Sequence, residues 1–160
     1  MKNKNEVIIR KINKIDLEKN KIRIVNLLID NYKINFPDRP YQKKLSLTNY
    51  NEMNYYLQNK SALIFAAFDE KNLIGFLWAY KKKLLGETRV HVDHIIIENK
   101  SRGKGIGGEL MRSIEEYSKK MKIGKIELMT SVENKKSINF YKSKGYSTER
   151  VLMTKEILKK

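Results

Sequence analysis

Four glycines fall between Gly103 and Gly108, where an apolar segment typical of a strand gives way to an amphipathic segment typical of a helix. Glycine allows backbone N–H groups to turn inward and lets a bound group approach the chain closely. The start of a helix adds N–H donors and a partial positive charge, and Arg102 and Lys104 add two cations. The segment therefore predicts a phosphate or pyrophosphate site at a helix N-terminus.

The glycines alone leave the phosphate ligand open. Gly103, Gly105 and Gly108 satisfy the dinucleotide pattern G-x-G-x-x-G, and Glu127 lies near the spacing at which that pattern expects an acid. A dinucleotide fold also needs further β-α-β units, and only about fifty residues follow. A nucleotide P-loop fits less well, because Glu109 stands where its lysine should be and a carboxylate there repels phosphates.

Two segments in register narrow the choice. Residues 95–107 read Ile-Ile-Ile-Glu-Asn-Lys-Ser-Arg-Gly-Lys-Gly-Ile-Gly, and residues 134–146 read Asn-x-x-Ser-x-x-Phe-Tyr-x-x-x-Gly-Tyr. The first resembles the acetyl-CoA signature of the GNAT N-acetyltransferase superfamily, and the second resembles that family's second conserved segment. Asn99 replaces a proline common in the family, and Ser137 replaces a common alanine.

The resemblance implies acetyl-CoA as the co-substrate and gives its contacts residue by residue. The pantetheine arm would pair with backbone groups of Ile95, Ile96 and Ile97, where the strand splays from its neighbour. The pyrophosphate would lie on the amides of Arg102, Gly103, Lys104, Gly105, Ile106, Gly107 and Gly108. Asn134 and Ser137 would contact the cofactor, and Tyr141 would lie near the thioester sulfur.

Hydrophobic periodicity predicts the secondary structure. Strands are expected at residues 7–12, 62–68, 73–83, 89–98 and 126–130, with one or two more within 146–158. Helices are expected at residues 17–34, 48–59, 105–121 and 134–144. Thr48 is the expected cap of the second helix, with Glu52 near the position of a capping-box acid, and Gly145 is expected to end the last helix.

These elements predict an α/β (α+β) fold in a single domain spanning residues 1–160. The expected sheet is GNAT-like, mixed and mostly antiparallel, with about 6–7 strands and helices on both faces. One parallel pair should be linked by the helix that follows the glycines.

Composition bounds the partners. The chain has no cysteine, which excludes disulfides and thiolate chemistry. Its net charge is +16, but the basic residues are scattered and no basic-plus-aromatic motif is present, so we expect no nucleic-acid partner. Two histidines and dispersed acids lack metal-ligand spacing, so no metal is expected. With no signal peptide or apolar span, the protein is expected to be cytoplasmic, without a membrane partner.

The chemistry implied by the resemblance is attack of a neutral amine on a thioester. Tyr141 is the expected proton donor to the leaving sulfur. Asp93 and His94 are the candidate bases, with His91, Glu87 or an ordered water as alternatives. Strand alternation predicts His91 and Asp93 on one face and His94 on the other.

The predicted activity is transfer of an acetyl group to a primary amine within a ternary complex. The acceptor is expected to be a small molecule or peptide, and either a monomer or a homodimer would be compatible. Transfer of another short acyl group, and a non-catalytic module that senses acyl-CoA or contacts RNA, remain alternatives. Residues 17–59 and 84–87 should shape the acceptor site, with Phe36, Arg39, Tyr41, Tyr55 and Tyr56 as candidate lining residues. The positive charge disfavours polycationic acceptors.

Overall fold

The computed structural model describes residues 6–37 and 41–157. The chain forms two compact units, the first ending at Met129 and the second beginning at Thr130. The two units are described separately below, and a single domain over residues 1–160 stays a prediction.

The first unit is built on a five-stranded sheet whose strands lie in chain order, β1-β2-β3-β4-β5. Neighbouring strands are antiparallel except β4 and β5, which are parallel and joined by a helix, as expected. The strands are β1 (Val7–Lys11), β2 (Ala62–Asp69), β3 (Asn72–Leu84), β4 (Glu87–Ile97) and β5 (Ile126–Leu128).

The sheet has fewer strands than the 6–7 predicted, because residues 146–157 form none; Leu158 lies outside the described residues. A strand is stable where its backbone groups pair with a neighbour and one of its faces is buried. In this segment Val151, Leu152 and Met153 are all more than three-quarters exposed. The apolar residues that suggested a strand therefore have no buried face to drive pairing.

The helices between β1 and β2 also differ in their boundaries from the prediction. The helix expected at residues 17–34 is two helices, α1 (Lys14–Lys19) and α2 (Lys21–Asn35). The break occurs because the Asn20 side-chain amide donates to the Asp16 carbonyl and ends the first helix. A capping box formed by Asn13 and Asp16 starts α1.

The next helix, α3 (Gln42–Gln58), begins six residues before the predicted start. Tyr41 precedes it in a left-handed conformation with φ of 71°. The prediction that Thr48 caps this helix is wrong, because Thr48 lies inside it and its hydroxyl donates to the Lys44 carbonyl at 3.1 Å. Glu52 is likewise an interior residue rather than part of a capping box.

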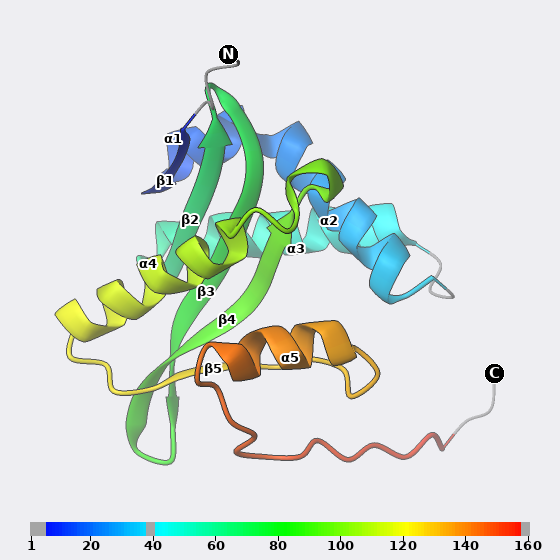
Figure 1. Ribbon diagram of the computed structural model, residues 1–160, viewed down its shortest axis with the longest axis vertical. Coiled ribbons are helices and arrows are strands. Elements are labelled where there is room, and N and C mark those ends of the chain that lie inside the picture. The colour runs from blue at the N-terminus through cyan, green and yellow to red at the C-terminus, as the bar shows by residue number, and fades with distance from the viewer. Residues whose placement is uncertain (1–5, 38–40, 158–160) are drawn as a thin grey trace. The chain divides into compact units, whose positions relative to one another are not determined.

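Helices cover both faces of the sheet, as predicted (Figure 1). On one face, α4 (Ile106–Lys120) buries Ile106, Leu110, Met111 and Ile114. On the other, α2 and α3 pack over the sheet around the largest aromatic side chains of β3. This second cluster includes Ile24, Leu28, Met53, Ile64, Phe76, Trp78 and Ile96.

The second unit contains α5 (Lys135–Ser143). Asn134 caps it by accepting a hydrogen bond from the Ser137 backbone N–H at 3.0 Å. Gly145 follows the helix with φ of +86°, the left-handed conformation that glycine adopts most easily. Both ends of this helix therefore agree with the prediction.

In the described residues β4-α4-β5 is the one parallel crossover, and no further β-α-β unit follows it. A dinucleotide fold requires a series of such units. The G-x-G-x-x-G alternative is therefore wrong for this chain, although its glycines still lie at a helix start.

The substitution Gly75→Ala tests how closely β3 lies against β4. A Cβ built on Gly75 would lie 2.8 Å from the Ile96 carbonyl oxygen, which is backbone and cannot move aside cheaply. We expect Gly75→Ala to lower the free energy of unfolding by about 1–3 kcal/mol, measured by urea denaturation. Gly124→Ala is the matched control, because a Cβ there meets nothing within 4 Å. Equal stability of the two variants would contradict this account of the strand spacing.

Candidate functional site

β4 is paired unequally along its two edges. Along β3 it is paired over its whole length, whereas β5 pairs with it only from Val90 to Val92. Beyond Val92, no described strand pairs with the β5-side edge. Backbone groups on that edge point alternately outward, so a ligand with amide groups can add to it as a further strand would.

Backbone alternation separates the three isoleucines expected to contact pantetheine. The Glu98 N–H donates to the Ile74 carbonyl on β3 at 2.9 Å. Two residues earlier, Ile96 therefore also directs its backbone toward β3, while Ile95 and Ile97 direct theirs toward the open edge. The backbone contact with pantetheine stays a prediction for Ile95 and Ile97. For Ile96 the prediction is wrong, because its backbone faces β3 and its side chain is buried in the α2–α3 cluster.

A turn fixed by Glu98 follows the open edge. This carboxylate contacts the Arg23 guanidinium of α2 and accepts the Ser101 hydroxyl hydrogen bond at 2.8 Å. Arg23 also donates to the Leu73 carbonyl at 2.8 Å. Sequence analysis missed Glu98 and Arg23, and no local pattern reveals a pair that is 75 residues apart. Together they fix where the chain leaves β4.

The glycine segment begins α4 as predicted. Gly103 and Gly105 have φ of +77° and +83°, and a Cβ on either would meet no atom within 4 Å. Gly105 is the N-cap residue, so the N–H groups of the first turn lack acceptors within the helix. Arg102 donates from Nε to the Ile97 carbonyl at 3.0 Å, which places its cation between the open edge and the helix start. Residues 102–105 are exposed, and Gly107 and Gly108 are partly exposed. We refer to residues 102–108 as the glycine cradle; its geometry suits an anion, and binding of phosphate there stays a prediction.

A β-bulge in β4 changes the predicted faces of the candidate bases. Trp78 lies opposite His94, but the next residue of β3, Ala79, lies opposite Val92, so Asp93 is an extra residue. His91 lies opposite Tyr80, which shares a face of β3 with Trp78. The prediction of opposite faces for the histidines is therefore wrong, since the inserted residue shifts the alternation by one.

His94 lies within a polar cluster on the α2–α3 side of the sheet. Its Nδ1 is 2.5 Å from Asp93 Oδ2, and its ring stacks on Trp78 with centroids 5.7 Å apart. Its Nε2 lies 3.4 Å from the Tyr32 hydroxyl and 3.3 Å from Asn49 Nδ2. A carboxylate beside Nδ1 favours the tautomer protonated there, which leaves Nε2 as an acceptor.

Tyr32 and Asn49 were not predicted as site residues. They lie 62 and 45 residues from His94 in the sequence, so no local spacing marks them. Burial raises the pKa of the Tyr32 hydroxyl, and the nearby Asp93 carboxylate raises it further. Tyr32 is therefore a neutral phenol that can donate to Nε2.

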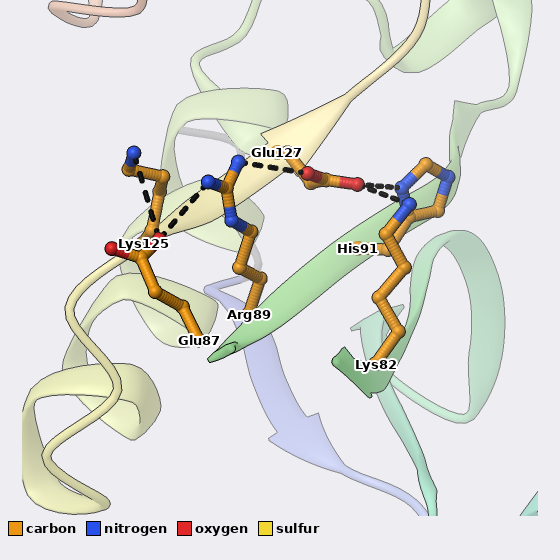
Figure 2. Close-up of polar contacts among 6 residues, drawn as sticks. All are labelled: Lys82, Glu87, Arg89, His91, Lys125 and Glu127. Carbon is orange, nitrogen blue, oxygen red and sulfur yellow. Dashed lines mark hydrogen bonds and ion pairs between the residues drawn. The ribbon is translucent and has the colours of Figure 1, made fainter. Parts of the chain in front are cut away.

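The other two candidate bases belong to a separate group of charges. His91 is buried, and its Nδ1 lies 3.0 Å from Glu127 Oε1. Glu87 pairs with Arg89 at 3.0 Å (Figure 2). Both side chains are engaged in ion pairs or hydrogen bonds within this group, which is separate from the polar cluster around His94.

A pocket opens between α2 and α3, lined by Tyr32, Phe36, Gln42 and Leu45. Phe36 was a predicted lining residue, and Tyr32 connects the pocket to His94. Tyr41 and Tyr55 are mostly exposed, and Tyr56 stacks on Tyr80 at 5.2 Å. Arg39 lies outside the described residues.

The remaining predicted site residues lie on the second unit. Asn134 uses its side-chain oxygen to cap α5 through Ser137, and Tyr141 is on the same helix with its ring 5.2 Å from Phe140. Burial raises the pKa of Tyr141 to about 12, so its phenol is protonated at neutral pH. Their contacts with the cofactor stay predictions.

Two further features concern the part of the chain that the structure describes. It contains no group of three histidine or carboxylate side chains arranged to hold a metal ion. It also contains no helix whose length and apolarity would suit a bilayer crossing.

The sequence matches the Acetyltransferase (GNAT) family over residues 22–146, which is most of the chain. The protein therefore belongs to this family. The matched range includes the open half of β4, the glycine cradle, the Asp93–His94 pair and Tyr141.

A shorter stretch resembles the uncharacterized N-acetyltransferase MJ1207 of Methanocaldococcus jannaschii. Identity is 38% over 61 residues, which is 38% of this chain and 27% of the length of that protein. The match therefore spans well under two-thirds of the relative.

Solved structures share the fold over nearly the whole chain. The aminoglycoside acetyltransferase meta-AAC0020, from an uncultured soil metagenomic sample, has a TM-score of 0.73 at 17% identity, covering 98% of this chain and 99% of its own. PaiA N-acetyltransferase of Thermoplasma acidophilum, in complex with coenzyme A, has a TM-score of 0.74 at 20% identity, covering 90% and 91%. At these identities the likeness establishes the fold alone.

The cradle is tested by two glycines with the same backbone strain. Gly105→Ala and Gly86→Ala each place a side chain at positive φ in open space, so both should lose a similar free energy of unfolding, about 1–2 kcal/mol. Only Gly105 lies at the start of α4; Gly86 is in the β3–β4 turn, at the other end of β4. We expect calorimetric titration to show coenzyme A binding weakened about tenfold by Gly105→Ala alone. Equal weakening in both variants would contradict the assignment.

Proposed function

We propose that this protein is an acetyl-CoA-dependent N-acetyltransferase that acetylates a primary amine by direct attack in a ternary complex. The observation that carries the proposal is the continuity of two binding features within residues 95–108. An open strand edge suited to pantetheine leads directly into an anion cradle suited to pyrophosphate. Bound acetyl-CoA supplies the thioester, while the residues of this chain orient the reactants and move protons.

His94 is the proposed general base. Its Nε2 lies within hydrogen-bonding distance of Tyr32 and Asn49, and Asp93 at Nδ1 holds the orientation of the ring. An arriving ammonium group would lose its proton to Nε2, directly or through a water. The neutral amine then attacks the thioester carbonyl, and a backbone N–H on the open edge of β4 can stabilise the resulting oxyanion.

Tyr141 is the proposed general acid. The leaving thiolate needs a proton, and a phenol that stays protonated at neutral pH can supply one. The nitrogen loses its surplus proton as the amide forms, and that proton restores the phenol. The resemblance of residues 134–146 to the family's second segment supports this role.

The pocket between α2 and α3 is the proposed acceptor site. Tyr32 lines it and also contacts His94, so an amine bound there would lie beside the base. Phe36 and Leu45 give it apolar walls, which favours a small molecule or peptide that carries an apolar group next to its amine. The aminoglycoside acetyltransferase named above shows that the fold accommodates small-molecule amines, but its acceptors are not transferred to this chain.

A screen of amines with acetyl-CoA tests the proposed activity. We expect amine-dependent release of coenzyme A, followed with a thiol reagent and confirmed by mass spectrometry of the acetylated product. The competing function is a module that contacts RNA. Salt-sensitive RNA binding without acetyl transfer would support the module and contradict the enzyme.

The base is tested by His94→Gln and Asp93→Asn. We expect His94→Gln to lower kcat about 100-fold or more and to remove the fall in rate on the acidic side of the pH profile, because that fall reflects protonation of the base. Asp93→Asn should lower kcat less, since His94 remains. Unchanged coenzyme A affinity by calorimetry is the control for folding. An acidic limb that persists in His94→Gln would exclude His94 as the base.

The acid is tested by Tyr141→Phe, which removes one oxygen and keeps the ring that contacts Phe140. We expect kcat to fall about 10- to 100-fold, with little change in the free energy of unfolding. Phe140→Leu is a control for packing in α5, because it changes the neighbouring ring without removing a proton donor. Wild-type kcat in Tyr141→Phe at saturating substrates would exclude the role.

A further inference from the structure

Glu127 joins three strands of the sheet (Figure 2). It lies on β5, and its carboxylate contacts the Lys82 ammonium group of β3. On β4, His91 Nδ1 lies 3.0 Å from Oε1 and Arg89 Nη1 lies 3.3 Å from Oε2. One side chain of β5 therefore interacts with cationic or hydrogen-bonding groups from both preceding strands.

The surroundings make this carboxylate costly to replace. The Arg89 side chain is 2% exposed and that of Glu127 is 11% exposed, so both charges are largely removed from water. Arg89 also pairs with Glu87, which lies 3.8 Å from Lys125 just before β5. Removing one member of such a group leaves a buried charge without its partner.

The Glu127 carboxylate is ionised over the whole physiological range. Burial by itself raises its pKa, but hydrogen bonds from Lys82, His91 and Arg89 outweigh burial and lower it to about 2. The interactions that join the three strands are therefore present whenever the protein is folded under ordinary conditions.

Backbone pairing between β5 and β4 is short. The parallel ladder has three register pairs, Val90 with Ile126, His91 with Glu127 and Val92 with Leu128. One further backbone bond, from Val90 N–H to the Lys125 carbonyl, lies before them at 3.0 Å. Glu127 is the middle residue of this ladder, and β4 loses its partner after the next pair, Val92 with Leu128.

We propose that Glu127 is a positioning residue for the cofactor slot, the open edge of β4 beside Ile95 and Ile97 where coenzyme A is proposed to bind. By holding β5 against β3 and β4 through Lys82, Arg89 and His91, it fixes where β5 separates from β4 and thus the opening beside Ile95 and Ile97. Glu127 contacts neither substrate nor any reacting atom in this arrangement. The inference rests on the proposed binding of acetyl-CoA at that edge.

Glu127→Gln tests the inference, since it keeps the shape and removes the charge. We expect the dissociation constant of coenzyme A and the KM for acetyl-CoA to rise about tenfold, with kcat changed less than about threefold. Hydrogen exchange at the backbone amide of residue 127, which the parallel register directs toward the Val90 carbonyl, should accelerate relative to β2 amides, because β5 would open locally.

Asp16→Asn is the matched control for a loss of stability alone. The Asp16 carboxylate also has a pKa of about 2, held down mainly by its hydrogen bond with Arg10, but it lies on α1 and contacts no residue of β4 or β5. This variant should lower the melting temperature and leave coenzyme A binding unchanged. If Glu127→Gln does not fold, Lys82→Met provides the test, because it removes one partner and leaves the carboxylate with Arg89 and His91. It should weaken binding about threefold.

The outcomes separate this inference from the proposed function. Wild-type coenzyme A affinity in Glu127→Gln, or unaltered exchange at the backbone amide of residue 127, would overturn the positioning role and leave the activity intact. Binding of coenzyme A by the wild type without acetyl transfer would overturn the proposed activity, while the variant would still test the slot. A wild type that binds no coenzyme A would overturn both.

Discussion

The incomplete pairing of β4 is the constraint on which the rest of the site depends. β4 is hydrogen-bonded to β3 from Glu87 to Ile97, so β3 fixes the position of β4 even beyond Val92, where β5 no longer pairs with it. The backbone groups released on the β5 side need hydrogen-bond partners, and a ligand with its own amides can supply them. The glycine cradle at the start of α4 then lies at the end of that same strand.

Charged side chains fix both limits of the open edge. At the far end, Glu98 holds the turn through Arg23 and Ser101, and Arg102 binds the last carbonyl of β4. At the near end, Glu127 holds β5 through cations of β3 and β4. Between them a bulge at Asp93 turns His94 toward the pocket side of the sheet. In the proposed function, the strand that binds the donor therefore also presents the base to the acceptor.

Local sequence patterns predicted the parts of this arrangement that local physics controls. The glycines at the start of α4, the amphipathic character of that helix and the end of α5 at Gly145 depend on neighbours in the chain, and each was located correctly. The faces of His91 and His94 were predicted wrongly, because the extra residue at Asp93 is defined only by the register with β3. Tyr32, Asn49 and Glu98 were missed for a related reason: their partners are distant in sequence. Residues 146–157 show the opposite failure, in which apolar residues that suggest a strand find no buried face.

The most direct test of the account is a titration of the isotopically labelled protein with coenzyme A, followed by the chemical shifts of backbone amides. The account predicts the largest shifts at the N–H groups of residues 103–108 and at Ile95 and Ile97, with smaller shifts at Ile96, whose backbone faces β3. Saturable binding with shifts confined to other parts of the molecule, or no binding at all, would contradict the claim that the open edge of β4 and the start of α4 hold the cofactor.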